Sequence, residues 1–351
     1  MDESDVRDRL RAVEDPDLGG DIVSLGLVNE VEVGETVHVD LALGAPYSPA
    51  ETAIAGDVRE ALSDLGLEVE LSASVDRPGG EEDVLPGVEN VIAVASGKGG
   101  VGKSTVAVNL AAGLAEMGAE VGLFDADIYG PNVPRMVDAD EVPSATEDER
   151  IIPPEQFGMK LMSMDFLVGE DDPVIFRGPM VHNVLTQLWE DVVWGRLDYM
   201  VVDLPPGTGD TQLSLLQSVP VSGAVIVTTP QEVALDDARK GLRMFGRHDT
   251  PVLGVVENMA GFVCPDCGSE HAIFGEGGGE RFAADVDMPF LGSVPLDPAV
   301  RQGGDDGAPM VRGEGDTAEA LREFTRKTAN MQGIVHRRRV SGARAGAESG
   351  D

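Results

Sequence analysis

The chain has 351 residues, of which 42% are apolar and only 4% aromatic, so its core must pack mainly aliphatic side chains. A formal net charge of −37 is spread along the chain, which argues against a nucleic-acid-binding surface and favours a halophilic source, where salt screens the self-repulsion. No apolar run has transmembrane length and the first residues are acidic, so we expect a cytoplasmic protein with no membrane contact.

Residues 1–75 are predicted to form a small α+β domain. Apolar residues recur at helical spacing in residues 6–13 and 51–65. Alternating apolar and polar residues predict strands at 31–33, 37–41 and 67–71. Residues 76–90, rich in glycine, proline and acidic residues at their start, have the composition of a linker.

Residues 91–332 alternate apolar strands with helices. Strands are predicted at 91–95, 121–124, 160–164, 200–202, 224–227 and 252–256, and helices include 106–117, 181–193 and 232–245. This order predicts an α/β domain with a doubly wound, mainly parallel sheet that binds its ligand at the carboxyl ends of the strands. Residues 333–351 are polar and are expected to be a disordered tail, although its arginines could instead contact an acidic surface.

The segment from Ser96 to Thr105 satisfies the phosphate-loop pattern G-x-x-x-x-G-K-[ST] through Gly97, Gly102, Lys103 and Ser104. It follows a predicted strand and precedes a predicted helix, as the motif requires. Lysine is scarce in this chain, yet Lys98 and Lys103 both lie in this loop. We therefore expect an ATP site in which Lys103 binds the β- and γ-phosphates and the Ser104 hydroxyl coordinates Mg²⁺.

Two further strand ends carry aspartates. Asp203 ends an apolar strand in the Walker B arrangement and is expected to hold the magnesium shell. The glycine-rich segment 204–210 after it is typical of a switch loop that senses the γ-phosphate. Asp127 is our candidate for orienting and deprotonating the attacking water. The alternative is that Asp125 and Asp127 merely cap their strand.

The loop and these aspartates together resemble the MinD/ParA-type ATPases with a deviant Walker A motif. More specifically, the chain is similar to the Mrp (ApbC-like) ATPases, which carry iron–sulfur clusters. The matching stretches are 97–105, 125–132, 176–180, 194–199, 203–210 and 257–260 leading into Cys264-Pro265-Asp266-Cys267.

This resemblance implies a set of site residues. The nucleotide would contact Gly97, Lys98, Gly99, Gly100, Val101, Gly102, Lys103, Ser104, Thr105 and Asp203. Lys98 would reach across a homodimer to the partner's nucleotide and act there in catalysis, and Asn258 would contact adenine. Cys264 and Cys267 would hold the cluster. Residues 1–75 resemble a SufT-like domain, but the Pro-x-Cys-Pro segment of its relatives reads Pro46-Tyr47-Ser48-Pro49 here, so this domain is not expected to ligate iron.

Cys264 and Cys267 are too few to complete a tetrahedral zinc site or a [4Fe–4S] cluster, each of which needs four ligands. A twofold dimer would place two such pairs face to face and supply all four. A zinc bridged in the same way, a redox pair and inert thiols remain alternatives, and His271 is close enough in sequence to be a substitute ligand.

These observations predict a slow homodimeric ATPase that holds a [4Fe–4S] cluster and passes it to apo-proteins, with an assembly scaffold as a further partner. Two other classes remain open. One is a partitioning or positioning ATPase of the MinD/ParA type, which uses ATP-dependent dimerisation to bind membrane or DNA. The other is a reductase similar to the nitrogenase iron protein, whose cluster cysteines lie far apart in sequence, unlike these.

Overall fold

The computed structural model describes residues 2–75, 84–127, 130–139, 141–166, 186–207, 209–264 and 267–348. Residues 1–80 and 329–351 form one compact unit, and residues 81–328 form a second. The first is a small α+β unit and the second contains a large, mainly parallel sheet with helices, which confirms the predicted fold class. Among the described residues, no helix is both long and apolar enough to cross a bilayer.

The small unit packs two helices against a three-stranded sheet of order β3-β4-β5. Strands β3 (Val28–Val33) and β4 (Thr36–Leu41) are antiparallel, and β4 pairs in parallel with β5 (Glu68–Ala73). Helices α1 (Glu3–Leu10) and α2 (Pro49–Leu62) bury their apolar residues, as the helical spacing predicts. The unit is completed by β1 (Glu14–Asp15), β2 (Gly20–Asp21) and the 3-10 turn η1 (Ser63–Leu65).

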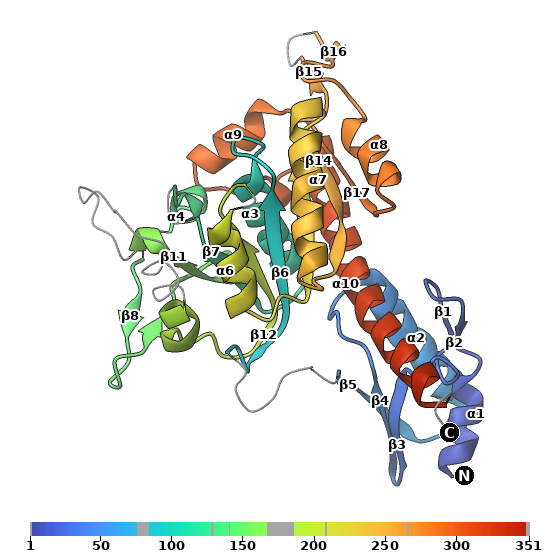
Figure 1. Ribbon diagram of the computed structural model, residues 1–351. Helices are drawn as coiled ribbons and strands as arrows, with labels where there is room; N and C mark the ends of the chain where they lie inside the picture. The colour runs from blue at the N-terminus through green and yellow to red at the C-terminus, as the bar shows by residue number, and fades with distance from the viewer. Residues whose placement is uncertain are drawn as a thin grey trace. The chain divides into compact units, whose positions relative to one another are not determined.

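The carboxyl-terminal segment is helical, so the prediction of a disordered tail is wrong for the residues that the structure describes. Helix α10 runs from Asp316 to Glu348 without a break (Figure 1). Its residues from 329 onward belong to the small unit, where Val340 packs against the apolar core and the Ser341 hydroxyl donates to the Leu25 carbonyl at 2.9 Å. This end of the helix is therefore stabilised by contacts with residues near the amino-terminal end of the sequence.

The contacts of Arg337 explain much of why this segment is helical. Its side chain is fully buried and donates to carboxylates of Asp15 at 2.6 Å, Asp17 at 2.6 Å and Glu51 at 2.8 Å. Burial raises the pKa of Glu51, and Arg337 opposes that shift. The next two arginines, Arg338 and Arg339, are exposed. One residue of the arginine run is therefore an internal ion-pair partner, and the other two are surface residues.

The second unit is built on an eight-stranded sheet of order β10-β11-β7-β12-β6-β13-β14-β17. All its pairings are parallel except the one between β10 and β11 at the edge. The strands are β6 (Val88–Ser96), β7 (Val121–Asp125), β10 (Glu155–Gln156), β11 (Met159–Ser163), β12 (Leu197–Asp203), β13 (Gly223–Thr228), β14 (Val252–Asn258) and β17 (Phe290–Val294). Six of these are the predicted strands; β10 and β17, both at sheet edges, were not predicted.

Helices cover both faces of this sheet. The connection from β6 to β7 runs toward one edge, whereas those from β13 to β14 and from β14 to β17 run toward the other. Right-handed crossovers therefore place α3 (Lys103–Glu116) on one face and α7 (Glu232–Arg247) and α8 (Gly278–Asp285) on the opposite face (Figure 1). By the same rule α6 (Asp210–Ser218), between β12 and β13, joins α7.

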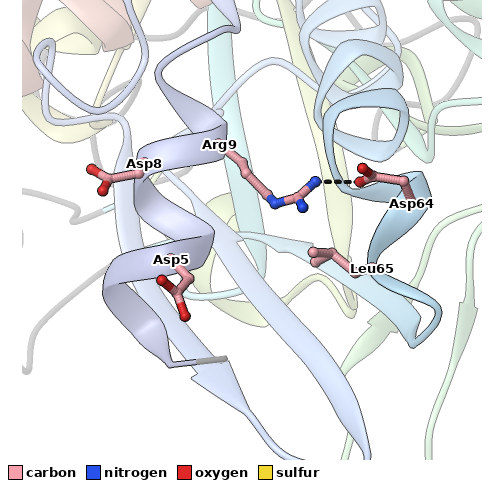
Figure 2. A pocket seen from close by; sticks show the side chains of 5 residues that line it. All are labelled: Asp5, Asp8, Arg9, Asp64 and Leu65. Atoms are coloured by element: carbon pink, nitrogen blue, oxygen red, sulfur yellow. Dashed lines mark hydrogen bonds and ion pairs between the residues drawn. The ribbon is translucent and has the colours of Figure 1, made fainter.

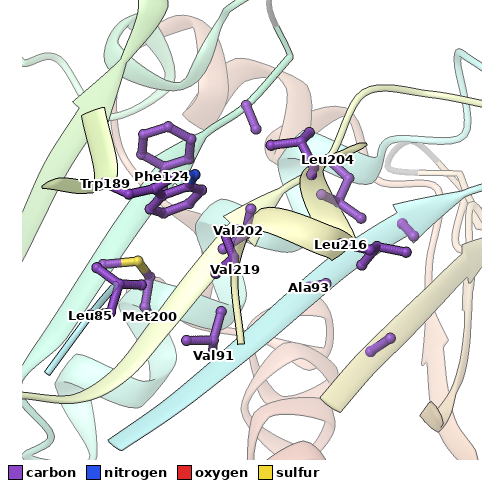
Figure 3. Packing of buried hydrophobic residues seen from close by; sticks show 14 of the residues in the cluster. Leu85, Val91, Ala93, Phe124, Trp189, Met200, Val202, Leu204, Leu216 and Val219 are labelled. Carbon is purple, nitrogen blue, oxygen red and sulfur yellow. The ribbon is translucent and has the colours of Figure 1, made fainter. Parts of the chain in front are cut away.

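The core beneath α6 and α7 is continuous across the strands (Figure 3). Phe124 of β7 packs on Trp189 with ring centroids 3.9 Å apart, and Leu216 of α6 belongs to the same buried cluster as Ala93 and Val202 of the central strands. This packing fixes the strand ends that carry the site. The remaining elements are α4 (Val133–Met136), β8 (Ser144–Ala145), β9 (Ile151–Ile152), η2 (Met164–Phe166), β15 (Phe262–Val263), β16 (Glu270–His271), α9 (Pro298–Asp305) and η3 (Met310–Arg312).

Several predictions fall wholly or partly outside the described residues. These are most of the linker, the first part of the predicted helix 181–193, and the family-like stretch 176–180. The described end of that helix, from residue 186 to 191, is helical.

Candidate functional site

The phosphate loop occupies the turn between β6 and α3. Gly100 and Gly102 have φ angles of +81° and +80°, a region that L-residues rarely adopt. A Cβ on Gly102 would lie 2.1 Å from the Asn258 side-chain nitrogen, and one on Gly97 would lie 2.2 Å from the Asp237 carbonyl carbon. These glycines allow the loop to lie against its neighbours, and α3 begins at Lys103 with its free N–H groups at the loop.

Lys103 and Asp203 form a buried ion pair at the centre of the site. The Lys103 side chain is 5% exposed and that of Asp203 is fully buried. The Lys103 ammonium also lies 3.4 Å from the Ser104 hydroxyl. The second carboxylate oxygen of Asp203 is buried and has no hydrogen-bond partner among the described residues. A buried carboxylate oxygen beside a serine hydroxyl is a donor set that fits Mg²⁺.

Asp125 stands on the neighbouring strand β7. It accepts hydrogen bonds from the backbone N–H groups of Asn132 and Val133 at 3.1 and 3.2 Å, and from the Ser163 hydroxyl at 3.2 Å. Burial, reinforced by the charge of Asp203, raises the pKa of Asp125 to about 7. Asp125 thus holds the loop after β7 in place, which agrees with the capping alternative for this residue.

Asp127 lies two residues beyond β7 and is half-buried. Its backbone N–H donates to Asp125 at 3.1 Å. Burial, then the charge of Asp127, raises the pKa of Asp203, while Lys103 opposes the shift. Asp127 is therefore close enough to the Lys103–Asp203 pair for its charge to act on Asp203, and its part in water activation stays a prediction.

The predicted switch segment 204–210 also meets the phosphate loop. Gly207, with a φ angle of +100°, donates its N–H to the Ser96 carbonyl at 3.0 Å. Gln212 is buried and its side-chain amide donates to the Pro205 carbonyl. Residue 208 and the side chain of Asp210 are outside the described part.

Asn258 ends strand β14 directly beside the loop. Its side chain is buried and donates to the Val101 carbonyl at 2.8 Å. The structure therefore brings Asn258 to the phosphate loop, and its expected contact with adenine stays a prediction. The adjacent Glu257 is fully buried and was not predicted as a site residue. It could have been found in the sequence as an acidic residue at the end of an otherwise apolar strand.

Lys98 lies at the outer side of the loop. It is half-buried, and its ammonium donates to the Gln231 side chain at 3.4 Å. Gln231 is exposed and is the residue before α7. Lys98 thus bonds to the residue before α7, whereas Lys103 pairs with Asp203, in agreement with distinct roles for the two lysines.

The two cysteines lie on a short β-hairpin formed by β15 and β16, which projects beyond the end of β14 in Figure 1. Cys264 is half-buried and Cys267 is exposed. Hydrogen bonding with Ser269, then with Cys264, lowers the pKa of the Cys267 thiol, which favours the thiolate that binds metals. Residues 265 and 266 are not described. Among the residues that are, no group of three His, Cys, Asp or Glu could hold a metal ion, so His271 does not complete a site.

Comparison with known proteins decides the family. Residues 87–330 match the family described as NUBPL iron-transfer P-loop NTPase, and residues 3–75 match the family of iron–sulfur cluster assembly proteins. The chain belongs to the NUBPL iron-transfer P-loop NTPase family. This confirms the resemblance to the Mrp (ApbC-like) ATPases and identifies the chain as a P-loop NTPase of a cluster-carrier family.

Two relatives match this NTPase chain over nearly its full length. The iron–sulfur cluster carrier protein of Synechocystis is 47% identical over 325 residues, covering 89% of this chain and 92% of the relative. The protein of the same name from Deinococcus radiodurans is 47% identical over 330 residues, covering 92% and 93%. The NTPase unit and the small unit thus occur together in these relatives.

Solved structures of similar proteins cover the NTPase part. A nucleotide-binding protein from Archaeoglobus fulgidus in complex with ADP has a TM-score of 0.60 and 36% identity, covering 68% of this chain and 96% of the other. The cell division ATPase MinD of Pyrococcus furiosus has a TM-score of 0.52 and 22% identity, covering 68% and 97%, and shows the fold alone.

The NTPase site does not coincide with the surface hollow found on the small unit (Figure 2). That hollow, of ≈ 460 Å³, is lined by Asp5, Asp8, Arg9, Asp64 and Leu65, and Arg9 pairs with Asp64 across it. It contains none of the predicted site residues. Ser48, which stands where relatives of the small domain carry cysteine, is buried and caps α2 through the Glu51 N–H at 3.4 Å.

Proposed function

We propose that this NTPase hydrolyses ATP and carries a [4Fe–4S] cluster held between two copies of the chain, delivering it to apo-proteins. The observation that supports this most strongly is the hairpin: it presents two thiols, one with a lowered pKa, in the same unit as a phosphate loop. The names of the relatives, iron–sulfur cluster carriers, point to the same cargo. The clients are apo forms of iron–sulfur proteins, and an assembly scaffold is the expected donor.

The cluster is cargo, and four thiolates hold such a cluster. Each chain contributes Cys264 and Cys267, so two chains related by a twofold axis complete the set. Zinc held by the same four thiolates is the competing occupant.

The nucleotide is proposed to bind with its phosphates on the N–H groups of the loop from Gly97 to Thr105. Lys103 would leave Asp203 to bind the β- and γ-phosphates, and Ser104 and Asp203 would then hold Mg²⁺, which neutralises phosphate charge when bound. Asp127 would orient the attacking water and accept its proton. Lys98 would act on the phosphates bound by the partner chain.

Replacing Lys98 by alanine is expected to leave ATP affinity within about threefold of wild type and to slow hydrolysis about 10²-fold, because the lost cation acts on charge that develops in the transition state. Calorimetric titration and phosphate release measure the two quantities. Lys327→Ala is the control, since Lys327 is a half-exposed lysine 3.8 Å from Glu323. Unchanged turnover in Lys98→Ala would count against a shared site.

Replacing Cys264 by serine is expected to lower the iron retained after anaerobic reconstitution at least roughly tenfold, because losing one thiolate per chain removes two of the four ligands from the dimer. Iron and zinc are measured by elemental analysis. Ser269→Ala is the matched control: it keeps both thiols and the iron, but moves thiol alkylation to higher pH, because Ser269 lowers the pKa of Cys267. Full iron content in Cys264→Ser would refute the bridging cluster, and zinc instead of iron would identify the competing occupant.

A further inference from the structure

The segment that carries the cysteines follows strand β14 after Asn258 and ends at Gly277, the residue before α8. Its base is held by Glu257, whose two carboxylate oxygens accept hydrogen bonds from the N–H groups of Gly277 at 3.2 Å and of Gly279. Glu257 is fully buried, and both donors lie at the start of α8, where the helix dipole favours a negative charge. We call Glu257 with Gly277, Gly278 and Gly279 the Glu257 clasp.

The clasp is connected to the phosphate loop by one direct step. Asn258, the next residue in the chain, donates to the Val101 carbonyl at 2.8 Å and lies so close to Gly102 that a Cβ there would be 2.1 Å from its side-chain nitrogen. The backbone of β14 therefore joins a residue fixed to the loop with a residue fixed to the base of the cysteine segment. A movement of Asn258 with the phosphate loop would therefore reach Glu257, and the reverse, through the single peptide bond between them.

A second route meets the same three glycines. A Cβ on Gly278 would lie 2.5 Å from the Pro230 carbonyl oxygen, so α8 packs directly on the residue before Gln231. Gln231 in turn accepts the hydrogen bond from Lys98. Two positions of the phosphate loop, Lys98 and Val101, thus reach the base of the cysteine segment through packed or hydrogen-bonded neighbours.

We propose that the Glu257 clasp couples the nucleotide site to the cysteine pair, with Glu257 as a positioning residue that touches neither ligand. Occupancy of the phosphate loop changes the affinity of the thiols for metal, and metal changes the nucleotide affinity by the same factor. This inference rests on the proposed function, because it needs both a nucleotide and a metal site. It adds the element through which the two communicate.

The experiment uses the full-length protein with Co²⁺ as the metal probe, followed by its thiolate absorbance, with and without a non-hydrolysable ATP analogue. In the wild type the analogue is expected to change the Co²⁺ affinity at least about fivefold. In Glu257→Gln, which turns one acceptor into a donor facing an N–H group, the factor is expected to fall below about twofold, while each ligand alone binds within about threefold of wild type.

Asp297→Asn is the matched control. Asp297 also caps a helix, accepting from the Ala299 N–H at 2.8 Å and from the Thr317 hydroxyl at 2.7 Å, and neither donor belongs to the clasp, so this variant should keep the wild-type factor. Gly279→Ala tests the clasp from its other side, since its methyl group would lie 2.8 Å from the Glu257 Cβ. It should lose the coupling as Glu257→Gln does.

A measurement on the wild type keeps the test independent of variant folding. The analogue should slow amide hydrogen exchange at residues 277–279, and unchanged exchange there would overturn the proposal. Coupling that persists in Glu257→Gln would overturn it as well, as would independent binding of both ligands to the wild type. Failure of the wild type to bind Co²⁺ or nucleotide at all would refute the proposed function instead.

Discussion

Replacing Arg337 by methionine is expected to cost the small unit about 3–5 kcal/mol in unfolding free energy, the usual effect of removing one partner from a buried ion-pair network. The substitution would leave Asp15 and Glu51 buried, and Asp17 partly buried, without their cation. Methionine fills much of the space of the arginine stem, so lost packing contributes little. Because the chain has two units, a single unfolding transition is not the right measure, and amide hydrogen exchange over residues 3–62 is.

The loss should depend on pH. Burial already raises the pKa of Glu51 against the opposing effect of Arg337, so the variant raises it further. A group whose pKa is raised on folding contributes stability at low pH that is lost as the pH rises through its folded pKa. Arg337→Met should therefore be closer to wild type at mildly acidic pH than at neutral pH.

The neighbouring arginines provide the control for this prediction. Arg338→Met and Arg339→Met change exposed side chains of the same helix and should stay within about 0.5 kcal/mol of wild type. A loss below about 1 kcal/mol in Arg337→Met would show that the carboxylates find water or other partners, and that the ion-pair network does not hold the helix.

Replacing Lys103 by alanine is expected to lower ATP hydrolysis about 10²–10³-fold, because it removes the cation that the proposed site uses to stabilise transferring phosphate charge. ATP affinity should fall too, since the same cation binds the ground-state phosphates. Phosphate release under saturating ATP separates these two effects. Lys240→Ala is the control, since Lys240 pairs with Asp237 at the surface, whereas Lys103 pairs with a buried aspartate.

The Lys103→Ala variant has a second readout that does not depend on ATP. Lys103 is the cation that opposes the raised pKa values of Asp203 and Asp125, the latter already about 7. Without Lys103 both carboxylates bind protons more readily in the folded protein. The folding free energy that their protonation contributes is lost as the pH rises through their folded-state pKa values. Between pH 6 and 8 the variant should lose stability more steeply than wild type. Hydrolysis near the wild-type rate would refute the assigned role of Lys103.

Local patterns located most of the residues that the structure brings together at the candidate site. The phosphate loop could be read from Gly97, Gly102, Lys103 and Ser104 because its chemistry requires particular residues at fixed spacing, and Asp203 followed from its place at a strand end. Glu257 was missed because its partners are backbone N–H groups some 20 residues onward, which no side-chain pattern encodes. The role of Asn258 at Val101 could not be predicted for the same reason.

The fold was predicted where periodicity is strong and not where distant contacts decide. Strand β17 alternates weakly and gains its structure by pairing with β14 at the sheet edge. The last part of α10 has the composition of a disordered tail, since its polar residues show no apolar repeat. Its helix is stabilised by Arg337 inside the small unit, and sequence reasoning could not pair that residue with Asp15 or Glu51.

Because α10 carries Arg337 into the small unit, the order of synthesis determines when that unit can be completed. Residues of the small unit near the amino terminus leave the ribosome first, and Arg337 follows on the order of tens of seconds later at ordinary rates of synthesis. Through that interval the carboxylates that pair with Arg337 lack their cation, so the small unit begins to be synthesised before the NTPase unit and is completed after it. A chain that ends between the NTPase unit and Arg337 would carry a small unit without this cation, and we expect proteases to cleave that unit faster.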